Sequence, residues 1–317
     1  MLLPFLTFSV GLALAESSDS NVVCEAPFRA IGPRCLLIDT SIIGPWDEVR
    51  QFCHGLKGEL VNMHDANTLH DIFLFIKENP ILDSTSYWIG AYDILEEGDW
   101  VWSYNNTRVR MNTPLWGVQS GRQEPTGGTY ENCAALNTDY FYYVFDDNCE
   151  ASNAAICAAT GNSVAAKPAD EEEKISPPNR ECPSPFTMIG NVCLLVDAVK
   201  ENPWSDQQLI CNALGGHMAK IQDANDLGDL YTYLISNEVI IDLWLGGSDS
   251  RLEDTWLWED DTEVPRGTPF WGAEGSGAQE PAGGMYENCL ALFRNDYFFF
   301  HDDRCDRMKG VICQYDI

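Results

Sequence analysis

The chain has few basic residues. Its 317 residues include 19 Lys and Arg against 49 Asp and Glu, which gives a formal net charge of −30. A surface of this sign repels nucleic acid and anionic membranes and attracts divalent cations. A generic solvated acidic surface accounts for most of these carboxylates, so the charge excludes nucleic-acid partners without selecting a ligand.

Long hydrophobic runs are also lacking. Beyond the N-terminus no stretch approaches 18 uninterrupted apolar residues, so we expect no membrane insertion. The first fifteen residues are apolar, end in Ala13-Leu14-Ala15 and precede a polar segment. This pattern predicts a signal peptide over residues 1–15, with a buried N-terminal element as the alternative. We therefore expect a secreted, extracellular protein, a compartment that suits its twelve cysteines.

Several catalytic and metal-binding motifs are missing. The chain has no Gly-x-Ser-x-Gly, no His-Glu-x-x-His and no phosphate-binding glycine loop. It also lacks Cys-x-x-Cys and histidines at zinc-finger spacing, which argues against zinc. We expect a protein that is not an enzyme; the alternative is a catalytic site confined to one part of the chain.

An internal repeat organises the sequence. Six cysteines recur as a second set of six, 158 positions later in the first half of the unit and 156 later in the second half. Trp88-Ile89-Gly90 likewise returns as Trp244-Leu245-Gly246. The repeat predicts two domains, 24–157 and 182–317, each large enough for its own core. Residues 158–181 are acidic, hold three prolines and predict an extended linker that lets the domains move independently.

Each copy is expected to contain two helices followed by short strands. Apolar periodicity predicts helices at 45–53 and 67–77, the latter starting at a capping-type Asn67, with counterparts at 203–214 and 225–235. Alternating aromatic-rich segments then predict strands, and this order indicates the α+β class. Trp88, Trp100 and Trp102 fall in strand-like segments, so we expect them in the core rather than stacked on a sugar.

These features together resemble the C-type lectin domain. The resemblance rests on the two helices, Trp-Ile-Gly, Trp-x-Trp, a Glu-Pro loop before one cysteine and Asp-Asp before the next. It implies two tandem C-type lectin-like domains with short antiparallel strands, and the layout is most similar to secreted two-domain lectins of crustaceans and other arthropods. Spacing alone leaves fifteen cysteine pairings open in each domain. The resemblance implies Cys24–Cys35, Cys53–Cys157 and Cys133–Cys149, then Cys182–Cys193, Cys211–Cys313 and Cys289–Cys305.

Carboxylates gather beside one cysteine pair in each copy. Calcium takes six to eight hard oxygen ligands, and carboxylates are the commonest of them in proteins. The resemblance implies that Ca²⁺ is bound here and that sugar hydroxyls complete its shell while carboxylates accept their protons. The predicted metal ligands are Glu124, Glu131, Asp146, Asp147, Glu280, Glu287, Asp302 and Asp303. The predicted carbohydrate-binding residues are Glu124, Thr126, Glu131, Asn132, Asp146, Asp147, Glu280, Glu287, Asn288 and Asp302.

The proline loop departs from the family pattern of Glu-Pro-Asn or Gln-Pro-Asp. It reads Glu124-Pro125-Thr126 and Glu280-Pro281-Ala282, so the third position lacks its amide or carboxylate. The step to the next glutamate is one residue short, which leaves Gln123-Glu124-Pro125 as an alternative register. We prefer the proline register because proline fixes the local geometry, and a cis bond before it would set two ligands on one side. The first glutamate favours mannose-type ligands.

We therefore expect a secreted, calcium-dependent carbohydrate-binding protein that recognises microbial glycans in innate immunity. Thr126 against Ala282 makes the first copy the better site, and two weak sites would gain from effective concentration. The alternative is a metal-independent, protein-binding domain of the same fold. Whether the chain forms a homo-oligomer is left open. Asn105-Asn106-Thr107 is a glycosylation sequon, with an unmodified loop as the alternative.

Overall fold

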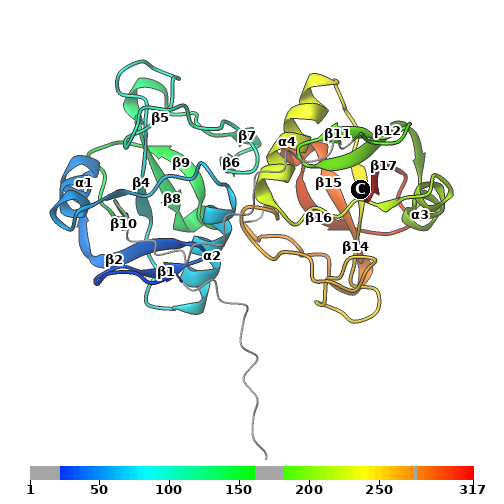
Figure 1. The fold of residues 1–317 in the computed structure, drawn as a ribbon, viewed down its shortest axis with the longest axis horizontal. Coiled ribbons are helices and arrows are strands. Elements are labelled where there is room, and N and C mark those ends of the chain that lie inside the picture. The colour runs from blue at the N-terminus through cyan, green and yellow to red at the C-terminus, as the bar shows by residue number, and fades with distance from the viewer. Residues whose placement is uncertain (1–21, 161–180, 274–276) are drawn as a thin grey trace, which may run out of the picture.

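The structure is a computed structural model that describes residues 22–160, 181–273 and 277–317. The predicted signal peptide and most of the predicted linker lie outside the described residues. Two domains lie next to each other, with α1 (Trp46–Gly55) and α3 (Trp204–Ala213) at the outer ends (Figure 1). In the described part of the chain no helix is both long and apolar enough to cross a bilayer.

Domain 1 is built on an eight-stranded mixed sheet. The main path is β1-β2-β10-β4-β8-β9, with β3 beside β10 and β5 beside β4. Strand β10, the last of the domain in chain order, runs antiparallel to β2 and parallel to β4. The strands of this sheet are β1 Arg29–Ile31, β2 Arg34–Gly44, β3 Gly58–Leu60, β4 Tyr87–Tyr92, β5 Val101–Trp102, β8 Cys133–Asn137, β9 Tyr143–Asp147 and β10 Asn153–Ala159. Strands β6 Val118–Gln119 and β7 Arg122–Gln123 pair with each other in a separate two-stranded sheet. The second helix is α2, Asn67–Glu78, and short turns η1 and η2 lie at Gly128–Tyr130 and Thr138–Tyr140.

Domain 2 repeats this plan with a seven-stranded sheet. Its main path is β11-β12-β17-β14-β15-β16, with β13 beside β17. The strands are β11 Thr187–Ile189, β12 Val192–Asn202, β13 His217–Met218, β14 Leu243–Ser248, β15 Cys289–Phe293, β16 Phe299–Asp303 and β17 Lys309–Tyr315. The second helix is α4, Ala224–Ser236, and turns η3 and η4 lie at Gly284–Tyr286 and Arg294–Asp296.

The α+β class and both helices of each domain are confirmed, but the order of elements differs from the prediction. The eleven-residue strand β2 precedes α1 and pairs with β1. Its side chains are mostly half-buried, so the sequence lacks the clean alternation that signals a strand. The parallel pairing of β10 with β4 also departs from the expected antiparallel strands. β10 runs to Ala159, past the expected boundary at Cys157.

The implied disulfide pattern is present in full. All six bonds join the cysteine pairs that the family resemblance implies. The predicted core tryptophans Trp88, Trp100 and Trp102 are buried, and the indole N–H of Trp88 donates to the Gly44 carbonyl at 2.8 Å. Each domain therefore combines a large aromatic core with three covalent links.

The two domains are packed against each other, so the prediction that they move independently is wrong. Asn67 does not cap α2; its side-chain oxygen instead accepts from the backbone N–H of Ala224 in domain 2 at 2.9 Å. The hydroxyl of Tyr143 donates to the Trp271 carbonyl at 2.8 Å. The composition of a linker predicts only the flexibility of that segment. Here the two domains are held together by contacts between their own surfaces.

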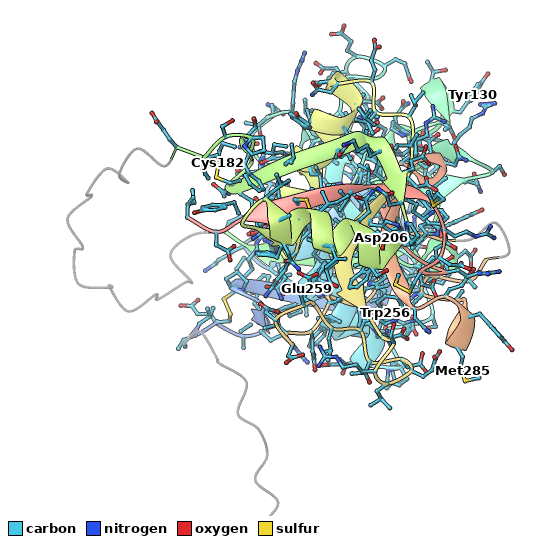
Figure 2. The ribbon with its side chains drawn as sticks, turned by 90° about the vertical axis from the view of Figure 1, so that its right-hand side faces the viewer. Tyr130, Cys182, Asp206, Trp256, Glu259 and Met285 are labelled. Carbon is cyan, nitrogen blue, oxygen red and sulfur yellow. A yellow bond between two sulfur atoms is a disulfide. The ribbon has the colours of Figure 1, made fainter. Side chains whose placement is uncertain are left out.

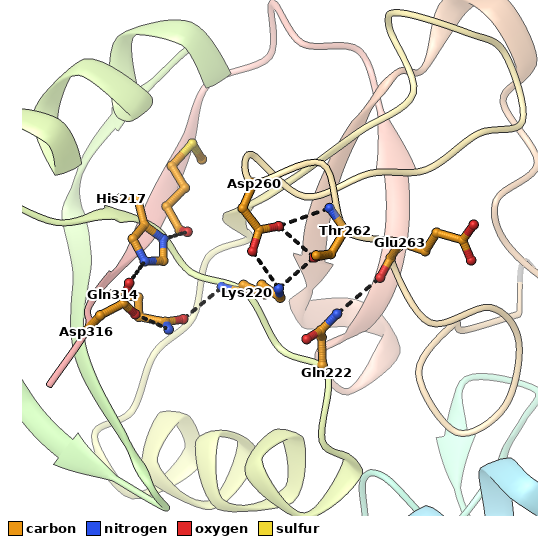
Figure 3. Close-up of polar contacts among 9 residues, drawn as sticks. His217, Lys220, Gln222, Asp260, Thr262, Glu263, Gln314 and Asp316 are labelled. Carbon is orange, nitrogen blue, oxygen red and sulfur yellow. Dashed lines mark hydrogen bonds and ion pairs between the residues drawn. The ribbon is translucent and has the colours of Figure 1, made fainter. Parts of the chain in front are cut away.

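A polar network anchors the long loop that carries the candidate site of domain 2 (Figure 3). The Lys220 ammonium contacts Asp260 at 2.7 Å and Thr262 at 2.6 Å, and its backbone N–H donates to Gln314 on β17 at 3.0 Å. The hydrogen bond from Lys220 lowers the pKa of Asp260 to about 2. The loop is thus tied through Lys220 to strand β17.

Candidate functional site

The candidate site of domain 1 forms where the loop after β7 meets strand β9. The Glu124–Pro125 bond is cis, as is Glu280–Pro281 in domain 2. The loop then passes through η1 into β8, which pairs with β9 and is joined to the following segment by Cys133–Cys149. Sheet pairing and a disulfide thus bring the predicted carboxylates of separate segments together.

Glu124 and Asp146 form a buried carboxylate pair. Their exposed fractions are 3% and 7%. Asp146 accepts from the backbone N–H groups of Thr126 at 3.1 Å and Gly127 at 2.6 Å. Burial and the hydrogen bond with Asp146 raise the pKa of Glu124 to about 7, against an opposing hydrogen bond from Thr126. Two acidic groups are therefore held together out of water.

Glu131 extends this pair toward Asp147. Its side chain folds over Gly127, where a Cβ atom would collide with the carboxylate. Burial, followed by the charges of Asp146 and Asp147, raises the pKa of Glu131. Asp147 accepts from Asn153 Nδ2 at 3.0 Å, so an amide already engages one of its oxygens.

Asn132 and its counterpart Asn288 use their amides locally. Asn132 Nδ2 donates to the Thr129 carbonyl at 3.1 Å, and Asn288 Nδ2 donates to the Met285 carbonyl at 3.3 Å. The side-chain oxygen of Asn288 is buried without a hydrogen-bond partner. Both residues therefore lie in the turn beside the site, where their predicted contact with sugar stays a prediction.

Domain 2 repeats the carboxylate pair. Asp302 accepts from the backbone N–H groups of Ala282 at 3.0 Å and Gly283 at 2.8 Å, and Glu280 also accepts from Ala282 at 2.9 Å. Burial and the hydrogen bond with Glu280 raise the pKa of Asp302 to about 7. Glu287 folds over Gly283 as Glu131 folds over Gly127. Glu280, Glu287 and Asp302 all line one open cavity of about 620 Å³.

His301 distinguishes domain 2 from domain 1. Its ring lies 2.7 Å from Asp296 and 3.4 Å from Glu280, and it is stacked on Phe293. Burial lowers its pKa, but the hydrogen bonds with Asp296 and Glu280 outweigh burial and raise it to about 9. Domain 1 has Phe145 at this position, stacked on Tyr140. This charged group was not predicted from the sequence, although the change from Phe145 to His301 was a visible signal of it.

A second internal cation engages the other predicted ligand of domain 2. The Lys309 ammonium lies 2.7 Å from Asp303 and 3.0 Å from Asp242, and its side chain is nearly fully buried. The corresponding residue of domain 1 is the neutral Asn153. Two protein cations thus stand beside the carboxylates of domain 2 where domain 1 has an aromatic ring and an amide.

Asp93 and Asp249 are buried acidic residues that sequence reasoning overlooked. Each leaves one carboxylate oxygen without a hydrogen-bond partner, while the other oxygen accepts a backbone N–H. Burial raises the pKa of Asp93, with Asp146 adding to the effect, and raises the pKa of Asp249 to about 6. Both follow the recurrent Trp-x-Gly segment, so their recurrence was a signal in the sequence.

Domain 1 gathers oxygen donors of the kind that calcium prefers. In the described residues, no Lys, Arg or His is among the groups that shift the pKa of Glu124, Glu131 or Asp93. Within the same residues no group of three or more Asp, Glu, His and Cys side chains is arranged to hold a metal ion. Glu124, Glu131 and Asp146 would hold the ion, and backbone, water or ligand oxygens would supply the remainder of its shell. Domain 2 fits less well because His301 and Lys309 already neutralise its carboxylates.

The turn beside each site carries an exposed tyrosine. Tyr130 ends η1 and Tyr286 ends η3, and each has 80% of its surface exposed. Figure 2 shows Tyr130 and Met285, the neighbour of Tyr286, projecting from the outline of the molecule.

Comparisons with known proteins agree with this architecture. The profile of the family described as the lectin C-type domain matches residues 44–159 and 200–315. C-type mannose receptor 2 of Homo sapiens is 25% identical over 187 residues, which cover 57% of this chain and 11% of the receptor. C-type lectin domain family 2 member G of Mus musculus is 26% identical over 203 residues, covering 59% of this chain and 73% of that protein. The chain thus corresponds to only a small part of the receptor.

Solved structures also match part of the chain. The mouse scavenger receptor C-type lectin carbohydrate-recognition domain matches 43% of this chain and 96% of its own chain, with 19% identity and a TM-score of 0.35. A calcium-independent type II antifreeze protein matches 43% of this chain and 94% of its own, with 24% identity and a TM-score of 0.35. Because the family profile matches both domains over most of their length, the chain belongs to the C-type lectin domain family.

Proposed function

We propose that this protein is a secreted carbohydrate-binding lectin whose first domain binds sugar through calcium. The observation that carries the proposal is the buried pair of Glu124 and Asp146, which has no protein cation beside it in the described residues. A calcium ion would offset their repulsion and present coordination positions to two neighbouring sugar hydroxyls. The glutamate before the proline favours mannose-type ligands. The protein binds without a catalytic step.

The biological setting is part of the same proposal. Microbial glycans in innate immunity would be the natural target of a secreted two-domain lectin, and the layout is similar to lectins of crustaceans and other arthropods. The relatives named above are mammalian, so this similarity is an analogy of domain organisation. Asn105 is an exposed residue, and glycan attachment there is proposed from its sequon.

Retention on immobilised glycans tests the calcium-dependent function. We expect the protein to be retained with calcium and released by a chelator or by free sugar. The double variant Glu124→Gln/Asp146→Asn should lose this retention, because calcium needs the two charges that the amides remove. The matched variant Glu280→Gln/Asp302→Asn should still be retained in a calcium-dependent way. Retention that is indifferent to the chelator, or to the first double variant, would contradict the proposal.

Acid should weaken calcium binding by domain 1. The pKa of Glu124 is raised to about 7 in the calcium-free protein, and calcium must displace its proton. We expect the apparent affinity to fall by up to about tenfold per pH unit below pH 7. Calorimetric calcium titrations of the full chain between about pH 5.5 and about pH 8 would measure this slope. An affinity that does not change over this range would contradict the role given to Glu124.

The raised pKa of Glu124 also predicts how the stability of the calcium-free protein changes with pH. The folded chain holds the Glu124 proton more tightly than the unfolded chain, in which the group has its ordinary pKa of 4.5. This contribution to stability therefore declines as the pH rises from about 4.5 to about 7. Calcium should raise the Tm more at about pH 8 than at about pH 5.5. Thermal unfolding of Glu124→Gln, which lacks the titrating group, provides the control.

Domain 2 has a second candidate function, metal-independent binding. His301 and Lys309 place protein cations against Glu280 and Asp303, so its carboxylates are neutralised within the chain. This arrangement favours the alternative of a lectin-like domain that binds a sugar or protein surface without calcium. Weak ligand binding by isolated domain 2 that a chelator leaves unchanged would support this function, and strictly calcium-dependent binding would contradict it.

A further inference from the structure

The two domains contact each other through the same residues in both directions. The backbone N–H of Ala66 donates to Asn225 Oδ1 at 3.0 Å, and that of Ala224 donates to Asn67 Oδ1 at 2.9 Å. Ala66 and Ala224 are counterparts in the repeat, as are Asn67 and Asn225. Such a reciprocal pair of hydrogen bonds is typical of an isologous, two-fold interface.

A second reciprocal pair lies on the other side of the interface. Thr113 Oγ1 donates to the Tyr297 carbonyl at 2.8 Å, and Thr268 Oγ1 donates to the Phe141 carbonyl at 2.6 Å. Thr113-Pro114 and Thr268-Pro269 are counterparts, and so are Phe141 and Tyr297. The two pairs together define a pseudo-two-fold relation between the domains.

Strands β9 and β16 meet at this pseudo-axis. The ring of Tyr143 packs edge-on against that of its counterpart Phe299, with centroids 5.0 Å apart. Both rings are buried. A residue that contacts its own counterpart must lie close to the axis that relates the copies. The edge strands of the two sheets are therefore held against each other.

The sequence of α4 is suited to this contact. Gly228 lies in the interior of the helix, where glycine costs about 1 kcal/mol relative to alanine. A Cβ atom at this position would collide with the guanidinium of Arg110 and approach Pro114 at 3.0 Å, both in domain 1. Arg110 also forms an ion pair with Asp229. Gly228, a weak helix former, therefore lies where domain 1 packs against α4.

The interface fixes the direction in which both sites point. Asp146 follows Tyr143 on β9 and Asp302 follows Phe299 on β16, each three residues or about 10 Å along its strand. A two-fold axis keeps the two copies at the same height along itself. Figure 2 accordingly shows Tyr130 and Met285 on the same side of the molecule, one at the upper end and one at the lower end.

We propose that the interlocked domains present their two sites, with the exposed Tyr130 and Tyr286 beside them, as a rigid pair that engages one glycan-coated surface at a fixed spacing. The inference rests on the proposed function of domain 1 and on sugar binding by domain 2 without calcium, and it adds the geometry of the target. A rigid pair gains affinity only where two sugars match its span, whereas two domains on a flexible linker tolerate many spacings.

Pairs of sugars on rigid DNA duplexes test this geometry. Mannose, galactose or N-acetylglucosamine would be placed in pairs at spacings from about 20 to about 80 Å, a range that brackets the dimensions of a two-domain protein. We expect the dissociation rate of the wild-type chain to reach one minimum, about a hundredfold below its value for a single sugar.

The double variant Gly228→Leu/Asp229→Arg supplies the comparison. The new leucine side chain would occupy the space of Arg110, and the new arginine would face Arg110 with like charge. The domains should therefore separate, and the radius of gyration measured by solution scattering should increase. The spacing optimum should then disappear. Ser236→Arg, an exposed position on the same helix, should behave as the wild type. Because both substitutions of the double variant lie in domain 2, calcium binding by domain 1 should be unchanged.

The outcomes separate the two proposals. Wild-type dissociation that is independent of spacing, or an optimum that persists after the domains have separated, would overturn the rigid pair. Failure of the wild type to bind any of the three sugars, singly or in pairs, would instead overturn the proposed function, and the rigid pair with it. A single optimum that is lost only in the interface variant supports both.

Discussion

The double variant His301→Phe/Asp296→Tyr is expected to create a calcium site in domain 2. It removes the imidazole that lies 3.4 Å from Glu280 and copies the stacked Phe145 and Tyr140 of domain 1. Asp296 is replaced together with His301 because its partly buried carboxylate would otherwise lose its partner. Glu280 and Asp302 would then form a carboxylate pair without a histidine cation, as in domain 1.

The reciprocal variant Tyr140→Asp/Phe145→His should weaken calcium binding in domain 1. A close buried charge pair contributes roughly 2–5 kcal/mol, so we expect a change of about a hundredfold in each direction. Equilibrium dialysis with calcium would report the stoichiometry, which should rise from one to two ions in the first variant. Equal calcium affinity of both wild-type domains would contradict this role of His301.

The sequence predicted the fold well because the fold depends on patterns that recur. Cysteine spacing, the Trp-Ile-Gly segment and two amphipathic helices recur in both copies, and the structure confirms the helices and all six disulfides. The strand β2 was missed because its half-buried residues have no regular alternation. The carboxylates beside Cys133–Cys149 were predicted as a group, and the structure brings Glu124 and Asp146 together.

The charge balance of the site could not be predicted, because it depends on contacts between distant residues. Lys309 meets Asp242 across 67 positions, and Asp93 approaches Asp146 only after the sheet has formed. The domain interface was missed for a related reason. Asn67 has the side chain of a helix cap, yet its partner is a backbone N–H of the other domain. A local pattern cannot distinguish these two uses.

Loss of the Cys53–Cys157 disulfide should give the largest loss of stability in domain 1. The bond closes a loop of 104 residues, and chain entropy predicts a cost of about 4.7 kcal/mol in the free energy of unfolding. The Cys24–Cys35 bond closes only 11 residues, for which the same relation gives about 2.8 kcal/mol. Urea unfolding of the two double alanine variants measures the difference. Equal losses would show that loop entropy is not the main source of stabilisation.

Loss of the third disulfide of the domain should affect calcium binding more than stability. Cys133–Cys149 closes 16 residues, which predicts a cost of about 3.1 kcal/mol, but it joins the two segments that carry Glu131 and Asp146. Its removal should therefore weaken calcium binding at temperatures where the domain is still folded. The Cys53–Cys157 variant should bind calcium normally below its lowered Tm. Calcium titration of both variants at about 10 °C, near the usual temperature of maximum stability, separates these roles. Equal loss of calcium affinity in both variants would contradict them.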